Sequence, residues 1–62
     1  MGITIRIRMD NAAFEPANGI EAARILRNLA EKLANAGELA ANDEVKLRDI
    51  NGNSVGSCKV WP

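Results

Sequence analysis

One long helical pattern constrains the fold of this 62-residue chain more than any other feature. Between residues 20 and 36 no Gly or Pro interrupts the chain, and apolar residues recur at the 3.6-residue spacing of an α-helix. These residues form one stripe: Ala22, Ile25, Leu26, Leu29, Leu33 and Ala36. Three alanines widen it on one flank, where small side chains would let a sheet approach closely: Ala23, Ala30 and Ala34. We predict a helix over 19–36, capped by Asn18 and Glu21 at its start and by Gly37 at its end.

The remaining chain supplies strands on which this helix can pack. Residues 3–9 alternate strictly, with Ile3, Ile5, Ile7 and Met9 on one face and Thr4, Arg6 and Arg8 on the other. Two further strands are predicted over 44–50 and 53–61, joined at Asn51-Gly52, because both of these residues tolerate a positive φ.

The hairpin admits two registers. A two-residue turn at Asn51-Gly52 places Val45 opposite Cys58 and Leu47 opposite Gly56, whereas a turn with a glycine bulge shifts the pairing by one residue. We prefer the first register, which collects the apolar side chains on the buried face: Val45, Leu47, Cys58 and Val60. It leaves a second set on the open face: Lys46, Arg48, Val55, Lys59 and Trp61.

These elements predict one α+β domain over residues 1–62, in the order β-α-β-β. The sheet has three strands, is mostly antiparallel, and carries one amphipathic helix on one face. We expect the third strand to lie between the first two; the alternative places the first strand parallel to the second through a right-handed crossover. Phe14, in the loop over residues 10–18, is expected to plug the core.

Composition excludes several classes of function. The chain has no His and one Cys, so it offers no imidazole base, no internal disulfide and no multi-cysteine metal site. We therefore predict that the protein is not an enzyme and has no cofactor and no metal. No apolar run is long enough to span a membrane, and the lack of disulfides favours a cytoplasmic location.

The charges are balanced overall but unevenly placed. Eight Lys and Arg residues match eight Asp and Glu residues, yet acids collect in the loops and bases on the strands. The open sheet face is expected to carry a basic patch flanked by an aromatic residue: Arg6, Arg8, Lys46, Arg48, Lys59 and Trp61. Arg and Trp often anchor interfaces, which suggests a docking surface. The competing interpretation is that the charges only keep an exposed sheet soluble.

Three segments carry a resemblance: DNAAFE (10–15), ARILRNLA (23–30) and LRDINGNSVG (47–56). They resemble short proteins encoded by phages and prophages, a group that includes anti-CRISPR inhibitors. The resemblance implies stoichiometric binding to a protein complex of a bacterial host, such as a subunit of a type I CRISPR-Cas effector, in the host cytoplasm. It identifies no binding residues.

Two alternative functions stay open. The basic sheet face would suit a nucleic-acid-binding accessory protein, although the neutral net charge makes nucleic acid the weaker expectation. A structural or assembly factor of a phage particle is the other alternative. The expected state is a monomer or a weak homo-oligomer.

Overall fold

The structure, a computed structural model, describes residues 1–62. Its elements, in chain order, are β1 (Gly2–Ile7), the 3-10 turn η1 (Ala12–Phe14), α1 (Asn18–Ala36), β2 (Glu44–Arg48) and β3 (Ser54–Trp61). This confirms the predicted β-α-β-β order. The first two strands end two residues earlier than predicted, at Ile7 and Arg48.

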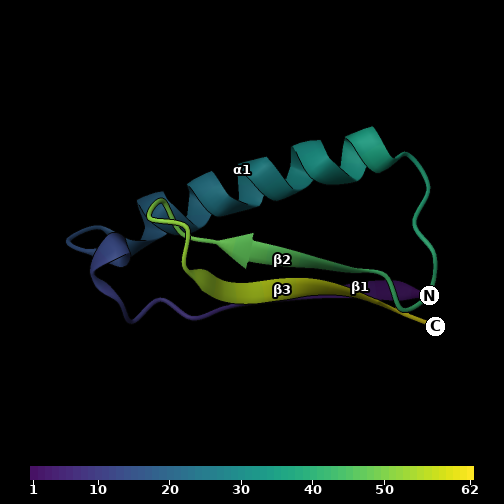
Figure 1. Ribbon diagram of the computed structural model, residues 1–62, viewed down its shortest axis with the longest axis horizontal. Helices are drawn as coiled ribbons and strands as arrows, with labels where there is room; N and C mark the ends of the chain where they lie inside the picture. Colours follow the sequence, from purple (N-terminus) through teal and green to yellow (C-terminus); the bar gives the residue numbers. More distant parts are fainter.

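The three strands form one antiparallel sheet in the order β1-β3-β2. The central strand is therefore β3, as predicted, and the parallel crossover is excluded. The helix lies along one face of the sheet and the other face carries no helix (Figure 1). The molecule is elongated, with extents of 36 × 19 × 17 Å.

The hairpin has the predicted pairing but not the predicted turn. Val45 is opposite Cys58 and Leu47 opposite Gly56. However, the turn spans Asp49 to Gly52: the Gly52 N–H donates to the Asp49 carbonyl at 3.0 Å, and Gly52 has a φ of 84°. This turn shifts the register by one residue, and a bulge between Leu47 and Arg48 shifts it back.

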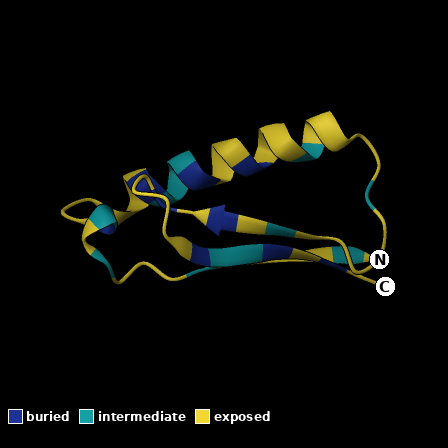
Figure 2. Cartoon of the chain, in the orientation of Figure 1, coloured by how far each residue is buried: buried dark blue, intermediate teal, exposed yellow.

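The bulge explains one wrong prediction about burial. Val55 was expected on the open face, but the extra residue in β3 turns it inward and it is 3% exposed. It joins the core formed by Phe14, Ile25, Leu29, Leu47 and Cys58. Phe14 plugs this core from η1, as predicted. Figure 2 shows the buried residues gathered mainly at the end of the molecule that holds η1 and the start of α1.

Two buried carboxylates tie the hairpin to the rest of the fold. Asp49 accepts from the backbone N–H groups of Asn51 and Asn53, each at 2.9 Å, and from the Asn11 side chain at 2.8 Å. Burial alone would raise the pKa of Asp49, but these hydrogen bonds outweigh it and hold the pKa below its ordinary value.

Glu21 forms the second link and was wrongly predicted as part of a helix cap. The helix begins at Asn18 after Ala17, which makes no side-chain cap. Glu21 is buried, where it pairs with Arg24 at 2.7 Å and accepts from the Ile50 N–H at 2.7 Å. The hydrogen bond from Arg24 lowers the pKa of Glu21. At the other end, Gly37 caps the helix as predicted, with a φ of 74°.

Candidate interaction face

Strand pairing brings the predicted cationic residues onto the face of the sheet that lacks a helix. Ser57 of β3 lies between Arg6 of β1 and Lys46 of β2, so these three residues form one row across the strands. The next row runs from Thr4 through Lys59 to Glu44. Side chains two apart on a strand share a face, so both rows project to the same side. We call this surface the open face.

The open face holds a shallow depression with cations on both sides. Arg6 of β1 and Arg8, which follows β1, lie on one side, and Lys46 of β2 lies on the other. Between them, β3 contributes small side chains, among them Ser54 and Ser57. Guanidinium and ammonium groups beside hydroxyls are suited to carboxylates and phosphates, because each group can donate hydrogen bonds to an anionic oxygen.

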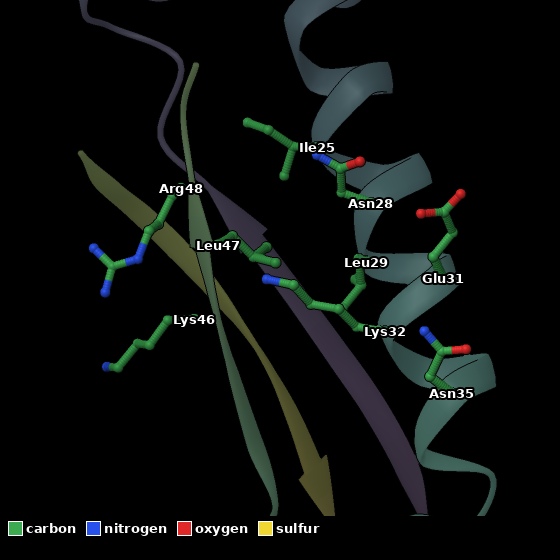
Figure 3. A pocket seen from close by; sticks show the side chains of 9 residues that line it. All are labelled: Ile25, Asn28, Leu29, Glu31, Lys32, Asn35, Lys46, Leu47 and Arg48. Carbon is green, nitrogen blue, oxygen red and sulfur yellow. The ribbon is translucent and has the colours of Figure 1, made fainter. Parts of the chain in front are cut away.

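Arg8 and Arg48 lie near the turn end of the sheet. Arg8 extends the pairing beyond β1, since its N–H donates to the Val55 carbonyl at 2.8 Å. Arg48 lies at the turn end of the sheet and donates to the Gly52 carbonyl at 3.3 Å. Figure 3 shows Lys46 and Arg48 leaving β2 on the side away from α1, whereas Leu47 points toward the helix.

Trp61 closes the opposite end of the open face. It pairs with Gly2 and is 51% exposed. A Cβ at Gly2 would collide with the Trp61 indole ring, so the ring lies directly over this glycine. The absence of a side chain at position 2 thus lets the aromatic ring pack against the end of β1.

The net charge of the open face is strongly positive. Its cations are all exposed: Arg6, Arg8, Lys46, Arg48 and Lys59. One carboxylate, Glu44, shares the face and lies 3.6 Å from Lys46. Most of the positive charge is therefore not paired within the chain and is available to an anionic partner.

Sequence reasoning missed the serines. Ser54 and Ser57 line the depression, but a serine in a strand gives no signal of its own. Their place between two basic strands follows only from the strand order, because β3 lies between β1 and β2. Once the order β1-β3-β2 is assumed, the register of Ser57 with Arg6 and Lys46 identifies this residue.

A second depression lies on the helix side of the sheet, between α1 and β2 (Figure 3). The helix lines it with mixed polar groups: Asn28, Glu31, Lys32 and Asn35. Together with Lys46 and Arg48 of β2, which also line it, the groove has three bases and one acid, and neutral amides separate the charges along the helix.

Comparisons with family models, curated proteins and solved structures found no match, and the open face is interpreted from its own geometry. No helix has the length and apolar character needed to cross a bilayer.

Proposed function

We propose that this protein acts by binding, and that its open face docks onto an acidic surface of a protein partner. One observation carries the proposal: Arg6 and Arg8 on one side and Lys46 on the other flank a serine-lined depression on a face that no helix covers. A carboxylate-rich surface would be drawn to this face over a distance of about 10 Å and then held by hydrogen bonds.

The composition of the face favours a protein over a nucleic acid. Sheets that read single-stranded RNA stack bases on aromatic side chains in the middle of the sheet. Here neither of the two rows holds an aromatic residue: they are Arg6, Ser57 and Lys46, and Thr4, Lys59 and Glu44. The one aromatic residue of the open face, Trp61, lies at its end. The chain is also neutral overall, which weakens attraction to a polyanion.

The resemblance to phage and prophage proteins suggests the kind of partner. Under this proposal the protein is a non-enzymatic inhibitor in the cytoplasm of a bacterial host, and the partner is a host complex such as a type I CRISPR-Cas effector. Occupying an acidic patch on such a complex would block it sterically, with one inhibitor bound for each patch.

The test compares two double variants with equal net charge. Arg6→Glu with Lys46→Glu reverses the centre of the open face, whereas Arg27→Glu with Lys32→Glu makes the same change on exposed residues of α1. Each protein is mixed with purified type I effector complexes, and co-elution and target-DNA binding are measured. We expect the wild type and the α1 variant to co-elute and inhibit, and the open-face variant to lose both effects.

Two results would contradict the proposal. If the wild type associates with no type I complex, the inhibitor role is lost. If the α1 variant loses binding as fully as the open-face variant, the open face is not the docking surface. A titration with single-stranded DNA and RNA at low salt tests the nucleic-acid alternative: tight, salt-dependent binding that the open-face variant abolishes would favour that alternative instead.

A further inference from the structure

The helix leaves the outer strand β1 uncovered. Ile3 and Ile5 pair with Val60 and Cys58, which are buried on the helix side, so both isoleucines point to that side as well. Nevertheless Ile3 is 43% exposed and Ile5 is 39% exposed. The isoleucine face of β1 was predicted to be buried, but the helix covers it only in part, because α1 packs toward β2.

The flank of α1 nearest to β1 is also apolar and exposed. The polar flank of the helix borders the groove with β2, which leaves the opposite flank on the side of β1. That flank carries Ala22, Leu26, Ala30 and Leu33, and Leu26 is 42% exposed. Ala30 and Ala34 were expected to let the sheet approach closely, but both stay exposed. An uncharged strip thus runs along the molecule beside β1.

The backbone of β1 has one free edge next to this strip. The Arg8 N–H donates to β3, and hydrogen-bonding direction alternates along an antiparallel strand. The N–H and C=O groups of the even-numbered residues therefore point to β3, and those of Ile3, Ile5 and Ile7 point outward. No Pro or bulge interrupts this edge, so it can accept another strand.

A second copy of β1 fits this edge in one register particularly well. If Ile5 lies opposite Ile5 of the other copy, Ile3 lies opposite Ile7, and the outward backbone groups form about six hydrogen bonds. Arg6 then lies opposite Thr4, and Arg8 opposite Gly2, so no arginine directly faces another. A shift by two residues toward the C-terminus would place Arg6 opposite Arg6, which like-charge repulsion disfavours.

We infer that the protein forms a twofold-symmetric homodimer through antiparallel pairing of β1 with β1 of a second copy, centred on Ile5. The pairing makes a continuous sheet of both copies, covers the isoleucines, and brings the two apolar helix flanks toward each other. A domain this small buries few residues alone, and association adds the missing apolar contacts. The inference stands independently of the proposed function.

Sedimentation equilibrium of the wild type from about 10 μM to about 1 mM tests the inference, with two variants beside it. Ile5→Lys places a charge at the centre of the pairing, and Ile20→Lys makes the same change at a residue of α1 that is 73% exposed. We expect a dimer mass at high concentration for the wild type and Ile20→Lys, and a dissociation constant raised about tenfold or more for Ile5→Lys. Circular dichroism checks that each variant is folded.

Amide exchange gives a readout that needs no substitution. Exchange of the Ile3, Ile5 and Ile7 amides should slow as concentration rises, while the amides of the β2 edge should not change. A monomer mass at every concentration would overturn the inference. So would a dimer whose β1 amides exchange equally fast at all concentrations, or one that Ile5→Lys and Ile20→Lys weaken equally. Leu26→Lys replaces Ile5→Lys should the latter not fold.

Discussion

Phe14 offers the sharpest test of how this small core is held together. It is the one phenylalanine of the chain, it is 2% exposed, and it packs from η1 into the core. Replacing such a residue with alanine costs about 3–5 kcal/mol, because the lost burial adds to the cost of the cavity. At about 0.05–0.15 kcal/mol per residue, the whole domain has a stability of about 3–9 kcal/mol. Phe14→Ala should therefore remove a third or more of it.

Urea unfolding and thermal unfolding, both followed by far-ultraviolet circular dichroism, measure this loss as a free energy and as a melting temperature. For a domain of this size we expect the melting temperature of Phe14→Ala to fall by about 12 °C or more. Phe14→Leu keeps most of the volume and should cost about 1 kcal/mol, so it stays measurable even where the alanine variant does not fold. The control is Ile20→Ala, at an exposed position, which should change stability by less than about 0.5 kcal/mol. A Phe14→Ala shift no larger than that of the control would refute the assignment of Phe14 to the core.

Three further predictions follow from the hairpin and the sheet. The pKa values of Glu21 and Asp49 are depressed in the folded state, so the ionised carboxylates stabilise the fold above about pH 5 and this effect is lost as pH falls below about 4. The urea midpoint of the wild type should therefore decline as the pH is lowered through this range. The decline should be smaller for Asp49→Asn, which has lost one of the two carboxylates. Gly56→Ala should disrupt the pairing of β1 with β3, because the new Cβ would collide with the Arg6 carbonyl oxygen; faster exchange of the β1 amides that face β3 would reveal it, and unchanged exchange would contradict it. Gly52→Ala should cost about 1 kcal/mol in thermal unfolding, because the φ of 84° disfavours a side chain; an unchanged melting temperature would argue against this turn.

The overall topology was predictable because the hydrophobic periodicity is strong. The helix over Asn18–Ala36 and its Gly37 cap follow from the apolar spacing and from the φ that glycine allows. The short hairpin made the pairing of β2 with β3 predictable, whereas the place of β1 beside β3 rather than β2 was a preference with an open alternative. The placement of Arg6 and Lys46 on one face then follows from the period of two residues in a strand.

What the sequence could not reveal depends on tertiary contacts. Glu21 has the spacing of a helix cap, yet it turns inward, where the Ile50 N–H and Arg24 both donate hydrogen bonds to its carboxylate. Val55 faces the core because the turn shifts the register by one residue and the bulge between Leu47 and Arg48 shifts it back. The sequence pattern indicates neither shift, because the pairing beyond the bulge is that of a hairpin without them. Ile3 and Ile5 alternate like buried residues, but one helix is too narrow to cover all three strands.

Because the core is unevenly distributed, the two halves of α1 should unfold locally at different rates. Glu21, Ile25 and Leu29 anchor the first half, whereas no residue from 30 to 36 is buried (Figure 2). The last turns should therefore fray many times for each complete unfolding event, while the first turns open only when the whole molecule does. A protease that needs a locally melted substrate would cut the helix in its second half first, which separates the core residues of η1 and α1 from those of the β2-β3 hairpin.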